Sequence, residues 1–150
     1  MDSVEIPDVS HDEFVDFLRV IYPSHKEVTE DNVESLLRLA DRFDVPFVTE
    51  RCEDFLLTTD HFSLAEKLLI SGQFQLCRLE NQCLKEVNSL ADLRHVSEAP
   101  EAALLTDFTK VSLYERMVRL SKEREEATVP LPPRPSAISY KVTHTPSFVF

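Results

Sequence analysis

Glycine is almost absent from this chain: Gly72 is the only one among 150 residues. Phosphate-cradling loops, dinucleotide-binding turns and nucleophile elbows each need two or more glycines at fixed spacing. The sequence therefore excludes the common nucleotide-dependent and α/β-hydrolase enzymes, and we expect no enzymatic activity and no small-molecule substrate. Long apolar runs are missing too, since no stretch approaches the roughly 18 residues of a membrane span.

Cysteine is sparse, with three residues, Cys52, Cys77 and Cys83, and no CxxC pair among them. An odd number of cysteines, and an amino terminus unlike a signal peptide, indicate reduced thiols and a cytoplasmic or nuclear location. We expect all three thiols to be buried and structural. The five histidines are dispersed and lack cysteines at zinc-ligand spacing, so neither a metal nor another cofactor is expected.

Acidic residues are in excess, with 27 Asp and Glu against 16 Lys and Arg and a net charge of −11. Residues 124–150 hold three basic and two acidic residues, so residues 1–123 carry −12. Such a body repels phosphate backbones and anionic lipid headgroups, and we expect neither nucleic acid nor a membrane as a partner. An acidic surface that aids solubility explains this charge more simply than a dedicated acidic docking surface.

One unit occurs twice, at residues 33–56 and 64–87, with a shift of 31 residues. In each copy two apolar helical stripes flank a tight turn, which predicts an αα-hairpin. Hairpins of this kind bury their apolar faces only against a neighbour, so the repeat predicts a stacked helical scaffold that binds other proteins. Residues that the shift superimposes are Leu37 and Leu68, Phe43 and Phe74, Val48 and Leu79, and Cys52 and Cys83.

Cap and turn signals predict where the helices begin and end. Ser10, followed three residues later by a glutamate, predicts a helix with a capping box, and Pro23 ends that helix. Thr29 is expected to cap the next helix. The two hairpins are expected to turn at 44–46 and at 72–74, the second around the lone glycine.

Weaker signals predict the remaining elements. Alternation at Val4–Ile6 predicts a short strand stub. Ser89 precedes a short helix, and a longer one is expected at 107–122. Its apolar residues Phe108, Val111, Tyr114, Met117 and Val118 fall on or near one face.

The composition changes after Glu123, because five of the nine prolines lie between Pro130 and Pro146. We therefore interpret residues 124–150 as a Pro-rich, mostly disordered tail. Its PLPPRP run satisfies the PxxP pattern of SH3 ligands. However, Arg134 lies one position before the place where a downstream basic anchor would be needed. A solvated linker is therefore favoured over an SH3 or WW ligand.

The run EIPDVSHDEFVDFLRVIYP, followed by VESLLRLADRFDVPFVTERCEDFL, resembles the second half of a BTB/POZ domain. A helix ending in IY, an L-x-LADrF helix and a V-x-x-C-E-x-F-L helix occur in the family's order. Residues 63–87 resemble the helical extension, the 3-box or start of a BACK region, of cullin adaptors. The implied organisation is a C-terminal part of a BTB/POZ-like domain at 1–59 and a helical extension at 60–123, before the tail.

The resemblance implies a mainly α fold, a strand stub followed by stacked αα-hairpins. The amino-terminal half of the family's domain is not matched, so the helix after Ser10 is expected to lack part of its packing layer. We therefore expect Phe14, Phe17 and Leu18 to be about half exposed.

The resemblance also implies a function, that of a dimerising module that presents partners to cullin-3 ubiquitin ligases. Cullin-3 or another BTB chain is the expected partner, and Tyr22, at the end of the IY helix, is the strongest candidate anchor. Tyr22 could equally be a core aromatic. A stand-alone helical scaffold, or a truncated BTB product unrelated to ubiquitin ligation, is the alternative. Five further residues are weaker partner-binding candidates, because each could equally be an ordinary surface residue. They are Asp16, Arg19, Ser24, His25 and Phe62.

Overall fold

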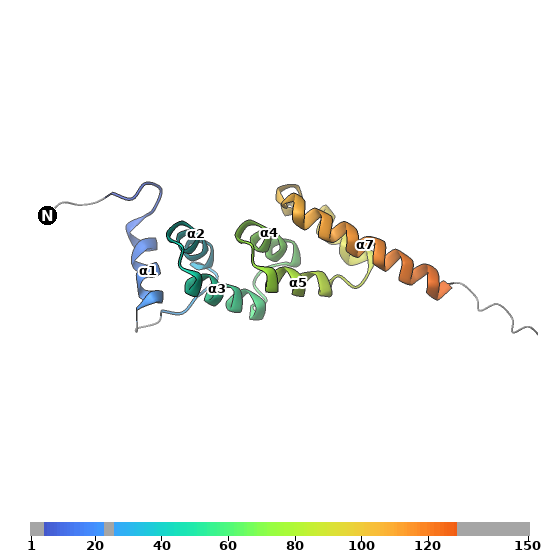
Figure 1. The fold of residues 1–150 in the computed structure, drawn as a ribbon, viewed down its shortest axis with the longest axis horizontal. Coiled ribbons are helices and arrows are strands. Elements are labelled where there is room, and N and C mark those ends of the chain that lie inside the picture. Colours follow the sequence, from blue (N-terminus) through green and yellow to red (C-terminus); the bar gives the residue numbers. More distant parts are fainter. Residues whose placement is uncertain (1–4, 23–25, 129–150) are drawn as a thin grey trace, which may run out of the picture.

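The computed structural model describes residues 5–22 and 26–128, and all regular secondary structure within these residues is helical, with no strand. The expected mainly α fold class is confirmed. Figure 1 shows the helices following one another along the long axis of the molecule, with α1 at one end and α7 at the other. The elements are α1 (His11–Ile21), α2 (Val33–Phe43), α3 (Pro46–Thr58), α4 (Leu64–Phe74), α5 (Cys77–Glu86), α6 (Leu90–Glu98), the 3₁₀ helix η1 (Pro100–Leu104) and α7 (Asp107–Thr128).

The strand stub expected at Val4–Ile6 is not seen in the described part of the chain. Glu5 and Ile6 have no regular structure, and Val4 lies outside the described residues. A strand is stable only when another strand satisfies its backbone hydrogen bonds. None of the described segments offers such an edge.

Serine caps position three of the helices. Ser10 Oγ accepts from the Glu13 backbone N–H at 3.2 Å, while the Glu13 carboxylate accepts from the Ser10 N–H at 3.0 Å, which confirms the predicted capping box. Ser63 with Glu66 and Ser89 with Asp92 repeat the arrangement at α4 and α6. Each box satisfies backbone donors that a helix start leaves unpaired.

Helix α2 begins later than predicted. Thr29 does not cap it; instead Thr29–Asn32 form a turn, and Asn32 precedes the first helical residue, Val33. The Asn32 side-chain oxygen accepts from the Thr29 N–H at 2.8 Å. The polar run after Thr29 therefore forms a side-chain-stabilised turn instead of a first helical turn.

Both hairpins turn through the same backbone conformation. Asp44 and Gln75, which are related by the shift of 31, adopt left-handed angles with φ of 51° and 56°. The next N–H in each case donates back to the helix that has just ended, from Val45 to Ala40 O and from Leu76 to Ser71 O, both at 2.9 Å. The repeat seen in the sequence is thus a repeat of structure.

The second turn lies later than the 72–74 expected from the glycine, because α4 continues through Gly72 to Phe74. Gly72 instead marks a close approach between helices. A Cβ at this position would lie 2.6 Å from Thr109 Oγ1 and 3.0 Å from Thr106 Oγ1, at the start of α7. The missing side chain therefore lets α7 pack against α4.

A buried carboxylate links the two hairpins. Glu53 of α3 is 7% exposed, and its Oε1 accepts from the backbone N–H groups of Arg78 and Leu79 at 2.9 and 3.0 Å. Its Oε2 accepts from Arg78 Nε at 3.0 Å. A side chain of the first hairpin therefore caps the first turn of α5, where the helix dipole favours negative charge.

Helix α1 packs more completely than expected. Phe17 is only 3% exposed, although Phe14 and Leu18 are half-buried as predicted. The rings of Phe14 and Phe17 lie 6.0 and 5.9 Å from that of Phe43 on α2. Phe43 is itself 41% exposed, so it covers α1 from the outside and shields Phe17 from solvent.

Helix α7 extends to Thr128, past the expected end at Lys122, so residues 124–128 of the predicted disordered tail are helical. Acidic and basic residues alternate through this last part of the helix, which suits an exposed helical end. Residues 129–150, which include the PLPPRP run, lie outside the described residues.

Candidate protein-interaction surfaces

Tyr22 stands at the exposed end of α1. It is the C-cap residue in extended conformation, its N–H donates to Leu18 O at 2.9 Å, and 61% of its surface is exposed. The alternative of a core aromatic does not hold. An exposed tyrosine fixed by a helix end offers a large contact area with a polar tip, the residue type that often anchors protein interfaces.

Lys26 contacts α1 through both its backbone and its side chain. The Lys26 N–H donates to Arg19 O at 3.1 Å, and Lys26 Nζ pairs with Asp16 Oδ1 at 2.5 Å. Asp16 is half-buried, and Arg19 is exposed. Two further predicted site residues, Ser24 and His25, lie outside the described residues.

Phe62 lies in the loop between α3 and α4 and is half-buried against the core. Its neighbour His61 approaches Glu30, with Nε2 and Oε1 3.9 Å apart. Glu30 belongs to the turn before α2, so the loop that carries Phe62 meets the connection that follows α1. The structure places Phe62 as a packing residue at this end of the hairpins, with part of its ring still accessible.

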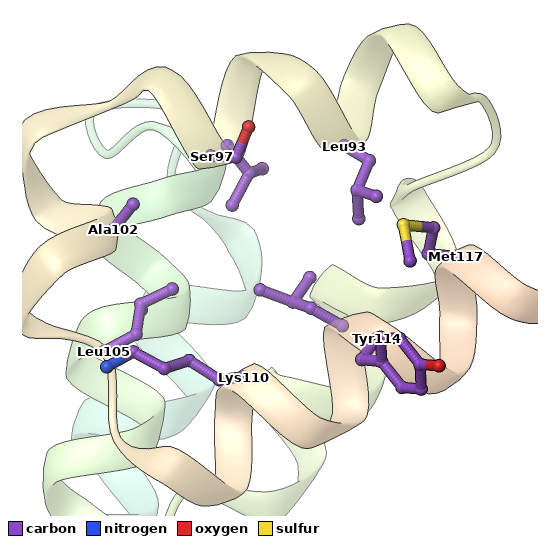
Figure 2. A pocket seen from close by; sticks show the side chains of 9 residues that line it. Leu93, Ser97, Ala102, Leu105, Lys110, Tyr114 and Met117 are labelled. Atoms are coloured by element: carbon purple, nitrogen blue, oxygen red, sulfur yellow. The ribbon is translucent and has the colours of Figure 1, made fainter.

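A second surface, which the sequence did not single out as a site, is an apolar groove between α6, η1 and α7. It has a volume of about 380 Å³. In Figure 2, Leu93 and Met117 line one end of the groove, Ala102 and Leu105 the other, and Tyr114 lies at its edge. Aliphatic walls with few polar groups suit an apolar side chain of a partner.

The outward side of α7, continuous with this groove, carries large apolar side chains in solvent. Phe108 is 71% exposed, Tyr114 61% and Val111 55%, and Leu104 of η1 is 67% exposed. The helix packs inward through Thr109, Leu113 and Leu120 instead. The sequence placed Phe108, Val111 and Tyr114 near one face but gave no sign that this face is outward, because periodicity does not distinguish a buried stripe from an exposed one.

The thiols offer little chemistry. Cys52 and Cys83 are buried, and burial raises the pKa of each to about 12, so both stay protonated at neutral pH. Cys77 is exposed, against the expectation of three buried thiols, because it begins α5 on the outer side of the second turn. Across the described ranges 5–22 and 26–128, no three potential metal-ligating side chains come together. No helix in that part is long and apolar enough to cross a membrane.

Comparison with known proteins finds one matching family and several relatives. The family model of the BTB/POZ domain matches residues 1–60. BTB and MATH domain-containing protein 38 of Caenorhabditis elegans is 36% identical over 118 residues, which cover 79% of this chain and 30% of that protein. BTB and MATH domain-containing protein 36 of the same organism is 35% identical over 121 residues, covering 81% of this chain and 38% of the relative.

A homologue in Caenorhabditis briggsae, BTB and MATH domain-containing protein 39, is 28% identical over 122 residues, or 81% of this chain and 36% of its own length. The chain thus spans about a third of the length of these curated relatives. No solved structure matches it significantly.

Proposed function

We propose, on the premise that residues 1–60 carry a BTB/POZ domain sequence, that this chain recruits a cullin-3 ubiquitin ligase through the end of α1. A BTB domain implies protein–protein interaction, and the curated relatives are BTB and MATH domain-containing proteins. Recruitment of cullin-3 is the specific form of that interaction that we infer.

The observation that carries this proposal is the exposure of Tyr22 on a rigid support. Tyr22 is 61% exposed, and its backbone N–H is fixed by the hydrogen bond to Leu18 O. Lys26 pairs with Asp16 on the same helix. An aromatic residue already ordered before binding loses little conformational entropy in the complex, which favours its use as an anchor.

Two further predicted residues belong to the proposed binding surface. Arg19 lies one helical turn before Tyr22 and offers a charged rim, while Phe62 adds accessible apolar area from the loop after α3. The His61–Glu30 contact joins that loop to the connection after α1. An exposed aromatic anchor with charged groups around it is typical of protein-binding surfaces.

A pull-down with purified cullin-3 tests this proposal. Tyr22→Ala should reduce recovery of cullin-3 by more than about tenfold, the loss typical of a central aromatic anchor. Tyr114→Ala is a matched control, because Tyr114 is also 61% exposed but lies on α7. Equal recovery with the two variants would rule out Tyr22 as the anchor, and the absence of recovery from the unmodified chain would refute the cullin-3 assignment.

The alternative function is a helical scaffold whose client is unrelated to ubiquitin ligation. The groove of about 380 Å³ beside α7 favours it, together with the exposed Phe108 and Val111. On this alternative, cullin-3 fails to bind and Tyr114, not Tyr22, contributes to client binding. The same pair of variants therefore distinguishes the two functions.

A further inference from the structure

We propose that a cationic cleft between α5 and α7 binds a phosphate monoester, carried by a phosphorylated side chain of a protein partner. The cleft has a volume of about 310 Å³, at the lower end of the range for ligand sites. It is separate from Tyr22 and from the apolar groove. Its lining side chains are Asn81, Leu84 and Lys85 of α5 and Ser112, Glu115, Arg116 and Arg119 of α7.

Its charge contrasts with that of the rest of the chain. Residues 129–150 hold two basic residues and no acidic one, so residues 1–128 carry a net charge of −13. Lys85, Arg116 and Arg119 contribute three positive charges to the cleft, and Glu115 one negative charge, a local excess of +2. Cations gathered around one concavity on an acidic body are the opposite of what an evenly solvated surface would show.

These cations are available to a ligand. Within the described residues neither Lys85 nor Arg119 forms an ion pair, in contrast to Lys26, Arg38 and Arg78, which all contact carboxylates. The exposed Asn81 amide adds a neutral donor at the same cleft. A phosphate needs donors of this kind on several sides, because each of its three terminal oxygens accepts hydrogen bonds.

Arg116 is held in place before a ligand arrives. Its Nε donates to Val87 O at 2.9 Å, at the carboxyl end of α5, and the side chain is partly buried. One of the five guanidinium N–H groups is thereby used, and the terminal nitrogens remain for a ligand. A planar guanidinium fixed in this way is suited to bidentate binding of an oxyanion.

The charge of the cleft favours phosphate over a carboxylate. A phosphate monoester carries about −1.5 to −2 at neutral pH and matches the local excess of +2, whereas a single carboxylate would leave one positive charge unbalanced. The cleft is open to solvent beside the exposed side of α7, so a side chain of another protein can reach it. The inference does not depend on cullin-3 binding, since no residue of the cleft belongs to the α1 surface.

NMR titration of the full chain tests this site. The probe is a blocked alanine pentapeptide with a central phosphoserine, with inorganic phosphate and the serine and glutamate peptides as comparisons. The phosphopeptide should give saturable shifts of the Asn81 side-chain amide and the Arg116 Nε–H, whereas the serine peptide should give none. Saturable binding of inorganic phosphate without binding of the phosphopeptide would overturn the protein-partner part of the proposal.

Paired substitutions make the test specific. Lys85→Gln with Arg119→Gln should weaken phosphopeptide binding by about tenfold or more, because two charge-assisted contacts are lost. Arg94→Gln with Lys122→Gln removes the same charge from exposed positions elsewhere on α6 and α7 and should change affinity less than about twofold. Glu115→Gln should strengthen binding about threefold by removing the one carboxylate. Equal losses from the two double variants would show attraction by overall charge only and would refute the site.

Discussion

The hairpins α2–α3 and α4–α5 follow the same backbone path, yet they differ in side chain at several positions where one of them meets a neighbouring element. Glu53, which caps α5, corresponds to Leu84 in the second copy, and Asp41 corresponds to Gly72, which admits α7. Leu36, fully buried, corresponds to Lys67, whose Nζ donates to Thr59 O at the end of α3 at 2.7 Å.

Positions that serve the hairpin itself agree much better between the copies. Leu37 and Leu68 are buried, as are Cys52 and Cys83, and both turns use a left-handed residue. The comparison shows that the repeat encodes the hairpin, whereas the exceptions to the repeat encode how hairpins join. Substitutions at positions where the two copies differ should therefore change folding stability by different amounts in the two hairpins.

The largest difference in the free energy of unfolding is expected between the variants Glu53→Ala and Leu84→Ala. Removing Glu53 leaves the part-buried N–H of Arg78 and the buried N–H of Leu79 without this acceptor, and we expect a loss of about 2–4 kcal/mol in the free energy of unfolding. Leu84 is half-buried, so its truncation should cost about 1 kcal/mol. Urea denaturation measures both, and similar losses would mean that Glu53 does not join the hairpins.

A smaller contrast is expected between Gly72→Ala and Asp41→Ala. The new methyl group would lie 2.6 Å from Thr109 Oγ1, so the Thr109 side chain or α7 must shift, at a cost of about 1–3 kcal/mol. Asp41 is exposed, and its replacement should change stability by less than about 0.5 kcal/mol. Adding Thr109→Ala should recover part of the loss in a double-mutant cycle of thermal unfolding. Additive losses would disprove the proposed contact.

The shared turn offers a gain in stability in both copies. Gln75 holds φ at 56°, a region that residues with a Cβ adopt at a cost, so Gln75→Gly should stabilise the chain by about 0.5–1 kcal/mol. Asp44→Gly should gain less, because Asp tolerates left-handed angles better than Gln does. Chemical denaturation measures both changes, and destabilisation by Gln75→Gly would contradict the account of the turn.

The smallest effect is a dependence on pH that separates the second hairpin from the first. The hydrogen bond from the Ser63 N–H lowers the pKa of Glu66, which caps α4, whereas α2 has no side-chain cap bond. A carboxyl whose pKa is lower in the folded state stabilises above its unfolded value of 4.5, and this contribution is lost as pH falls through the folded-state pKa.

Urea midpoints measured between pH 6 and about pH 3 should therefore fall less steeply in Glu66→Gln than in the unmodified chain. The variant should also start from a lower midpoint at pH 6, because the charged cap is gone. An unchanged slope would show that Glu66 does not contribute to the acid sensitivity.

The sequence was sufficient for the features that arise from local chemistry. The capping box at Ser10, the elbow at 44–46 and the repeated hairpin all follow from residues close together in the chain. The second turn was predicted too early, at 72–74, because a lone glycine marks a turn more often than a close contact between helices. The shift of 31 applied to Asp44 gives Gln75 directly, so the repeat was the better guide.

The interaction surfaces were harder to predict from the sequence. Tyr22 could be chosen through a family resemblance, but its exposure depends on how α1 packs against the other helices. The groove beside α7 needs the relative placement of α6 and α7, which no local pattern contains. The same holds for the cleft of Lys85 and Arg119, whose members are 34 residues apart in the sequence.

The contact between the hairpins has a consequence for how this sequence can diverge. Glu53 Oε1 accepts from main-chain amides, which every residue except proline supplies. A substitution at position 78 other than proline therefore removes the contact of Arg78 Nε with Glu53 Oε2 but keeps both main-chain contacts with Glu53 Oε1. New surface specificities can arise there over evolutionary time while the relative orientation of the two hairpins is preserved.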